Sequence, residues 1–328
     1  KFFFIQMLRK ALKIHKSFHF LKMLLLLQLL SYSFSTNPSR VYFTKQITPE
    51  AITKLYELLE QPLNGRVGVK ISTGEKGGNN WLHPELIGDF VHHVDGTIVE
   101  CNTFYAGQRD TSEKHWKVIE EHGFLKMAKC DILDEEGEIG IPVPRYQHMK
   151  DFFVGSHIVN YDSFVILSHF KGHSMGGFGG ALKNIAIGFG SSRGKGVVHS
   201  AGNLNPTLDM FDTTPQIDFL ETMAEAVSAF VDRTKKENIV YISVAYNLSI
   251  DCDCDSNPAP PEMADIGIFA SLDPVALDQA CVDAVYNSPD NGKHSLIHRM
   301  EDRVAIHILE KGEELGLGNR EYEIVEVE

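Results

Sequence analysis

Two cysteines and three aspartates stand in five consecutive residues, Asp251-Cys252-Asp253-Cys254-Asp255 (the Asp-Cys loop). Neighbouring carboxylates repel one another, so the cluster costs free energy unless a cation or basic side chains offset it. Thiolates and carboxylates bind metals, although this spacing is not a standard zinc pattern. The loop predicts a metal or cluster site with Asp251, Cys252, Asp253 and Cys254 as ligands. The alternative is a solvated acidic loop whose cysteines pack inward.

A glycine-rich segment, residues 168–184, is the second candidate site. Its four closely spaced glycines let backbone N–H groups approach a ligand, and the helix expected from Ala181 would favour an anion at its N-terminus. Its spacing is not that of a P-loop. The alternative is a glycine turn that packs a helix tightly against a strand. As a site, it offers Lys171 and Lys183 to counter an anion, His169 and His173 as ligands or proton carriers, and Gly177, Gly179, Gly180 and Asn184 as ligand contacts.

Two smaller groups of polar residues are also candidate ligand-binding sites. Arg193 and Lys195, with His199 behind them, form a basic patch in an acidic chain, suited to a phosphate, a carboxylate or the Asp-Cys loop. An exposed flexible turn is the alternative. Asn102, Tyr105 and Arg109 follow a strand-like run and could bind polar substrate groups. The remaining candidates have simpler interpretations: structural roles for His115 and His122, a solvated carboxylate for Asp278, and core packing for Cys130 and Cys281.

Strand-like segments alternate with helix-like segments along the chain, and these elements must position the candidate residues. Such alternation indicates parallel β-α units and so predicts an α/β fold, a mostly parallel sheet flanked by helices. We expect a single domain over residues 37–328, with a lobe boundary near residues 140–150 where Pro142 and Pro144 interrupt the pattern. The expected strands are 40–43, 66–71, 96–101, 162–167, 239–245 and 266–269, and the expected helices are 49–59, 84–93, 113–122, 217–232, 274–286 and 294–315.

The composition limits the function classes. The 328 residues are 43% hydrophobic and 23% charged, as in ordinary globular proteins, with a net charge of -13. Such acidity argues against a nucleic-acid-binding surface. The five cysteines are an odd number without framework spacing, which predicts a reduced, cytoplasmic protein rather than a disulfide scaffold.

Residues 1–36 are a basic leader with a short apolar run at 23–30. The run is too short for a stable membrane span. The leader is either signal-like, which implies export, or a misassigned start, because the chain begins with Lys rather than Met.

Several of these motifs together resemble a family of uncharacterised proteins, the domain of unknown function 362, often labelled iron–sulfur centre proteins. The resemblance runs from about Ser39 to the C-terminus. Many members carry a ferredoxin-like insert with Cys-x-x-Cys repeats, and this chain has no Cys-x-x-Cys, so no standard ferredoxin cluster motif is present. The family label therefore implies an iron–sulfur centre only at Cys252 and Cys254, completed by residues such as His169 or His173. The motifs that carry the resemblance are Cys101–Arg109, His122–Phe124, Ser168–His173, Gly177–Asn184, Ser192–Lys195, His199-Ser200, Asp251–Cys254 and Asp273–Ala276.

Three hypotheses follow. The first is a metal-dependent enzyme or redox protein that acts on a small anionic molecule, with zinc or iron–sulfur as the metal centre. The second is a metal-free protein that binds a phosphorylated metabolite or nucleotide through the glycine-rich segment. The third is a non-enzymatic redox or cofactor-assembly partner whose acidic face docks a basic protein.

Overall fold

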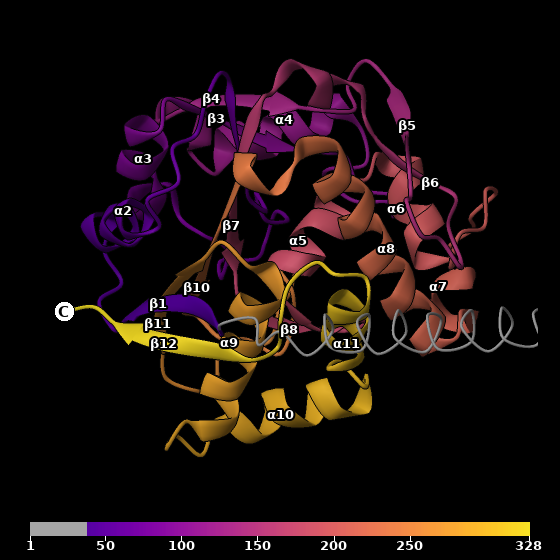
Figure 1. The fold of residues 1–328 in the computed structure, drawn as a ribbon. Helices are drawn as coiled ribbons and strands as arrows, with labels where there is room; N and C mark the ends of the chain where they lie inside the picture. Colours follow the sequence, from indigo (N-terminus) through magenta and orange to yellow (C-terminus); the bar gives the residue numbers. More distant parts are fainter. Residues whose placement is uncertain (1–37) are drawn as a thin grey trace, which may run out of the picture. The chain divides into compact units, whose positions relative to one another are not determined.

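The computed structural model describes residues 38–328, and the leader predicted at residues 1–36 lies outside them. An eight-stranded sheet runs through the centre of this part of the chain (Figure 1). Its strand order is β12 (Tyr322–Glu326), β1 (Ser39–Thr44), β11 (Gly267–Ser271), β10 (Ile239–Ala245), β7 (Ser163–His169), β2 (Val67–Lys70), β3 (Gly96–Glu100) and β4 (Lys129–Ile132). Only the pairs of β11 with β1 and with β10 are antiparallel. The predicted α/β class with a mostly parallel sheet is confirmed.

Apolar residues on both faces of the central strands explain why helices cover both sides of the sheet. In β7, Phe164 and Ile166 belong to one buried cluster, whereas Val165 and Leu167 belong to the other. A strand buried on both faces is typical of parallel sheets. The helices that contribute buried residues to the first cluster are α5 (Ala181–Gly188), α6 (Ser192–His199), α8 (Gln216–Thr234), α9 (Pro274–Asn287), α10 (Lys293–Asp302) and α11 (His307–Glu314).

The opposite face of the sheet is covered mainly by α2 (Pro49–Leu58) and α3 (Pro84–His93). Thr48 caps α2 through its side chain, which accepts a hydrogen bond from the Ala51 N–H, and Pro49 opens the helix. The α4 helix (Ser112–Glu121) and the short α7 (Met210–Thr213) complete the α-helices of the described chain, and three short 3-10 helices lie at Phe124–Lys126, Ser156–Asn160 and Lys236–Asn238. Two antiparallel hairpins stand outside the main sheet, β5 (Glu138–Pro142) with β6 (Asp151–Gly155) and β8 (Lys171–His173) with β9 (Gly177–Gly179).

One predicted element is wrong. The expected helix over residues 294–315 is two helices, α10 and α11, because Val304 between them adopts a φ of 49° that an α-helix cannot accommodate. The exposed flexible turn that was the alternative for the segment around Arg193 is also wrong, because the segment is the helix α6, which Ser191 caps by accepting the Gly194 N–H. The β5–β6 hairpin occupies the region of the predicted lobe boundary, and that boundary stays a prediction. Among the described helices, none is long and apolar enough to span a membrane.

Candidate functional site

The polar candidate residues lie at the edge of the sheet where the parallel strands β2, β3, β7 and β10 end. Lys70, Glu100 and His169 are the last residues of three of these strands. A cavity of about 830 Å³ opens here, and its walls include parts of the Asp-Cys loop and of the glycine-rich segment. The carboxyl ends of parallel strands are where open α/β sheets usually bind ligands, and the volume suits a small molecule.

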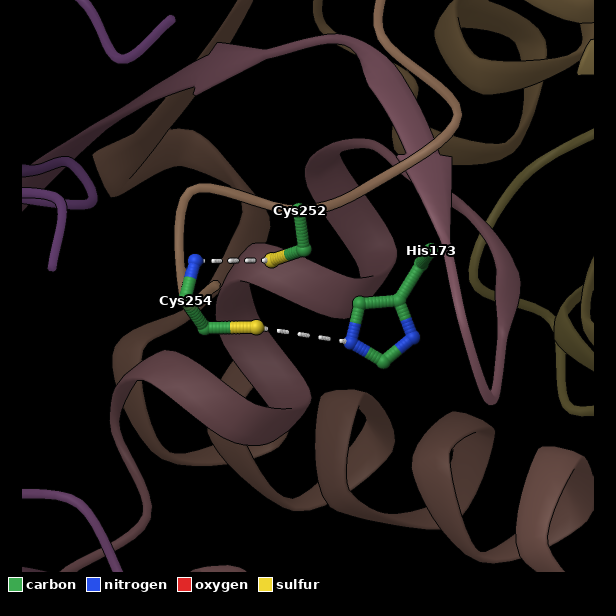
Figure 2. Close-up of side chains that lie close together, drawn as sticks. All are labelled: His173, Cys252 and Cys254. Atoms are coloured by element: carbon green, nitrogen blue, oxygen red, sulfur yellow. Dashed lines mark hydrogen bonds between the residues drawn. The ribbon is translucent and has the colours of Figure 1, made fainter. Parts of the chain in front are cut away.

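Cys252, Cys254 and His173 form a cluster on the cavity wall (Figure 2). Their two sulfur atoms and one ring nitrogen lie within 4.8 Å of one another. The Cys254 Sγ is 4.0 Å from the His173 Nε2, and the Cys254 backbone N–H donates to the Cys252 Sγ at 3.4 Å. His173 is the last residue of β8, so the cluster joins segments about eighty residues apart in the sequence.

The environment favours one thiolate in this pair. A hydrogen bond from the Cys254 thiol, together with the nearby Lys183 ammonium, holds the pKa of Cys252 well below its usual range. The same hydrogen bond raises the pKa of Cys254. The Lys183 Nζ lies 3.4 Å from the Cys252 Sγ, so a half-buried lysine compensates the thiolate charge.

The backbone around His173 determines the tautomer of its ring. Its Nδ1 accepts hydrogen bonds from the N–H groups of Met175 at 3.1 Å and Gly176 at 2.9 Å. In the neutral ring the proton therefore resides on Nε2, which faces the sulfur atoms. Two thiols and a histidine are a donor set that zinc uses. The thiol pair fits a metal directly, whereas the His173 ring as oriented is suited to donate a hydrogen bond to a sulfur.

Asp253 takes no part in this cluster, in contrast to its predicted role as a metal ligand. Its buried carboxylate accepts hydrogen bonds from the His169 Nδ1 and the Lys171 Nζ, both at 2.7 Å. The His169 Nε2 lies 2.7 Å from the Tyr246 carbonyl, so acceptors occupy both ring nitrogens and no lone pair is free for a metal. Asp251 lines the cavity but is held by Arg299, 3.3 Å away, and it too stands outside the cluster.

The expectation that the N-terminus of α5 binds a ligand anion is wrong. Asp278 from α9, which is fully buried rather than solvated, accepts the Ala181 N–H at 2.7 Å and the Leu182 N–H at 2.9 Å. The protein itself therefore supplies the acceptor at this helix end, a carboxyl whose pKa burial raises to about 7. Gly180 allows the contact, because a Cβ there would lie 2.4 Å from an Asp278 oxygen.

The other predicted contacts of the glycine-rich segment differ in their placement. Gly179, Gly180 and Asn184 line the cavity. The Asn184 side chain donates to the Lys70 and Leu167 carbonyls, which ties the ends of two strands together. Gly177 does not line the cavity; it adopts a φ of +80° and packs against Ala305.

Arg109 is buried and fully engaged. Its guanidinium contacts Glu75 at 3.3 Å and Glu100 at 3.0 Å and donates to the Tyr105 hydroxyl at 3.2 Å. Tyr105 in turn donates to the Cys254 carbonyl at 3.1 Å, so Tyr105 and Arg109 together hold the Asp-Cys loop in place. Tyr105 and Arg109 line the cavity, whereas Asn102, hydrogen-bonded to Ser112 and His115, does not.

The predicted basic patch divides between the surface and the cavity. Arg193 pairs with Glu138 and lies over the Phe153 ring, away from the cavity lining. Lys195 and His199 turn inward from α6 and line the cavity. The opposite directions follow from helical spacing, because residues two apart on a helix face different sides while residues four apart share one.

Sequence reasoning missed Lys70, which is 1% exposed and lines the cavity at the end of β2. The signal was present, since a lysine closes an otherwise apolar strand, Val67–Lys70, and such a residue needs a buried polar partner. Glu100, which closes strand β3, and Glu75, which lies in a loop, were also missed, and both carboxylates contact Arg109.

The fold and the site together define a class: an α/β protein with a thiol pair, a histidine and several lysines around one cavity at the carboxyl end of its sheet. The chain belongs to the family described as domain of unknown function 362, whose model matches residues 67–283. All the residues of the cluster fall within that match. None of the curated proteins has a matching sequence.

Two solved structures have a similar course of the chain. One is the lactate racemase apoprotein from Thermoanaerobacterium thermosaccharolyticum, with 14% identity and a TM-score of 0.43 over 74% of this chain and 56% of that one. The other is a protein from Thermotoga maritima, with 10% identity and a TM-score of 0.41 over 73% of this chain and 58% of that one. The chain thus spans a little over half the length of both proteins.

Proposed function

We propose that this protein binds a thiophilic metal ion through Cys252 and Cys254 and holds a small anionic ligand in the adjoining cavity. The observation that carries the proposal is the grouping of both sulfur atoms with a ring nitrogen of His173, within 4.8 Å of one another, on the wall of that cavity. Such a metal would supply Lewis-acid chemistry if it is zinc, or electron transfer if it is iron.

The chain's own residues support the arrangement. Tyr105 and Asp253 anchor the Asp-Cys loop from two sides, through the Cys254 carbonyl and through the buried ion pair with Lys171. This anchoring orders the two thiols before a metal arrives. Lys183, 3.4 Å from the Cys252 Sγ, limits the negative charge that a pair of thiolates would otherwise accumulate.

A metal-free anion-binding protein is the second candidate, and two observations favour it. Lys183 already compensates the Cys252 thiolate without a metal. The His173 Nδ1 accepts two backbone N–H groups, which leaves a proton rather than a lone pair on Nε2. In this second function the cysteines and His173 form a hydrogen-bonded wall of the ligand cavity.

Elemental analysis and an absorption spectrum of anaerobically purified protein separate the two functions. Under the first, purified protein carries metal, or binds added Zn²⁺ or Fe²⁺ with a rise in melting temperature. Cys252→Ser and Cys254→Ser abolish that binding, whereas Cys130→Ser, a thiol outside the cavity, retains it. A metal-free protein whose melting temperature does not change with added Zn²⁺ or Fe²⁺ overturns the first function in favour of the second.

The substitution His173→Gln assigns the histidine's role. If His173 donates a hydrogen bond to a sulfur, the variant keeps its metal with altered affinity. If His173 is a ligand, the variant loses metal as the cysteine variants do.

A further inference from the structure

Two lysines in the cavity, Lys70 and Lys195, have neither a carboxylate nor a thiolate in contact among the described residues. The Lys70 Nζ donates to the Ile71 carbonyl and, at 3.1 Å, to the Asn184 side chain. The Lys195 Nζ donates to the carbonyls of Gly190 at 2.7 Å and Cys101 at 3.3 Å. Both side chains are buried and both line the cavity. We call Lys70 and Lys195 the lysine pair.

The lysine pair is electrostatically strained. Burial lowers the pKa of Lys70 to about 8, and the charge of Lys195 contributes to that effect. Burial also lowers the pKa of Lys195. A buried ammonium with only carbonyl partners costs free energy that a contacting anion would offset. The other lysines of the cavity wall differ, because Lys171 contacts Asp253, Lys76 contacts Glu121 and Lys183 contacts the Cys252 sulfur.

The nearby carboxylates do not fill this role. Glu100 is occupied by Arg109 at 3.0 Å and by the Thr73 N–H at 2.9 Å, so it acts on the lysines only from beyond contact distance. Asp134, the other acidic neighbour of Lys195, accepts the backbone N–H groups of Asn102 and Ser192. A position for a further anion therefore remains at the lysine pair.

An aromatic wall lies beside the lysine pair. The His199 ring stacks between Phe211, with 4.4 Å between centroids, and Phe219 at 5.1 Å, and Phe211 stacks in turn on Phe104 at 5.7 Å. We call the rings of His199, Phe211 and Phe104 the aromatic wall, and all three line the cavity. His199 follows Lys195 by four residues on α6, so the wall and the lysine pair share one side of that helix.

The His199 ring adds an acceptor to this wall. Its Nδ1–H donates to the Lys195 carbonyl at 2.7 Å, which leaves the lone pair on Nε2. Burial lowers the pKa of His199 to about 3, so the ring stays neutral near neutral pH.

We propose that the cavity binds a planar aromatic oxyanion, with its carboxylate or phosphate at the lysine pair and its ring against the aromatic wall. The proposal rests on the anion-binding part of the proposed function and is independent of the metal. The cavity volume of about 830 Å³ accommodates such a ligand. Edge-to-face contact with the wall or stacking on the outer face of Phe104 would recognise the ring, and contact with the two ammonium groups would recognise the oxyanion.

Calorimetric titration of the wild-type protein tests the proposal. The aromatic probes are benzoate and adenosine monophosphate, and each is compared with the anion of the same kind that lacks a ring, acetate for benzoate and inorganic phosphate for adenosine monophosphate. Aromatic oxyanions should bind more tightly than the ringless anion of the same kind, and the tighter of the two aromatic probes identifies carboxylate or phosphate as the preferred group. Lys70→Met and Lys195→Met should each weaken binding about tenfold or more, because a hydrogen bond to a charged group is lost. Phe211→Leu should remove the advantage of the ring without changing acetate or phosphate binding.

Two controls make the outcome decisive. Lys76→Met removes a cavity-lining lysine that is already paired, and it should leave binding unchanged. In the Cys252→Ser/Cys254→Ser variant, retained binding shows that the lysine pair acts without the metal site. Loss of binding in that variant overturns the lysine pair as the anion site and places the anion at the thiols.

The wild-type protein supplies a test that needs no folded lysine variant. A bound aromatic oxyanion should protect Lys70 and Lys195, but not Lys76, from acetylation detected by mass spectrometry. Equal modification of all three with and without saturating benzoate or adenosine monophosphate overturns the proposal, as does wild-type protein that binds neither probe.

Discussion

The contact between Gly180 and Asp278 offers the sharpest test of how the fold positions the site. The Asp278 carboxylate accepts the first two N–H groups of α5, at 2.7 and 2.9 Å. That helix carries Lys183 in its first turn, where the Nζ reaches the Cys252 Sγ at 3.4 Å. A displacement of the helix start therefore displaces the lysine that compensates the thiolate.

The substitution Gly180→Ala places a Cβ 2.4 Å from one Asp278 oxygen and 2.8 Å from the other, far inside van der Waals contact. Asp278 is 0% exposed and cannot swing aside. Burial raises the pKa of Asp278 to about 7, so the carboxyl is ionised above that pH. Each hydrogen bond to a charged group contributes about 1.5–3 kcal/mol, so losing both at about pH 8 or above destabilises the protein by about 3–6 kcal/mol. The φ of Gly180 is -138°, so this cost comes from the close approach and not from backbone strain.

Urea unfolding followed by tryptophan fluorescence measures the change. Gly140→Ala is the matched control, because its Cβ would meet nothing closer than 3.5 Å; we expect a change within about 0.5 kcal/mol. In an Asp278→Ala background the same Gly180→Ala change should cost about 1 kcal/mol or less, since the clash is gone. The reasoning is refuted if Gly180→Ala is as mild as the control, or equally costly in both backgrounds.

Three further predictions concern the charged groups. Asp253→Asn should destabilise the protein by about 3–5 kcal/mol in urea unfolding, because it breaks a buried ion pair; a loss under 1 kcal/mol would contradict this. His157→Gln should flatten the pH dependence of the free energy of unfolding. A hydrogen bond to Asp131 raises the pKa of His157 above its usual 6.5 in the folded protein. The protonated histidine therefore stabilises the fold fully below pH 6.5, and this stabilisation is lost as the pH rises through the raised pKa. Parallel stability curves for wild type and variant would exclude that role. Arg193→Gln should leave ligand binding unchanged and cost about 0–1 kcal/mol, as expected for an exposed pair outside the cavity; weakened binding of any cavity ligand would show that Arg193 takes part after all.

Local patterns predicted most of the architecture. The cap and proline at Thr48-Pro49 and at Asp273-Pro274 open helices where they were expected, and the apolar run Ile239–Ala245 is a strand with those bounds. These features succeed because they depend on neighbouring residues alone. The expected helix across Val304 was wrong because Val304, whose side chain is exposed, adopts a φ of 49°, and a valine in a helical sequence gives no local signal of that conformation.

Residue types and strand-end positions, all readable from the sequence, determined which segments carry the polar chemistry. The Asp-Cys loop and the glycine-rich segment do meet at one cavity, because parallel strands bring their carboxyl ends to the same edge of the sheet. Only the tertiary structure decided the partner of each charge: Asp253 for Lys171, Asp278 for the start of α5, and no carboxylate in contact with Lys70 or Lys195 among the described residues. Such pairings join residues tens of positions apart, and their energies depend on burial and on distances of a few ångströms, which no local pattern encodes.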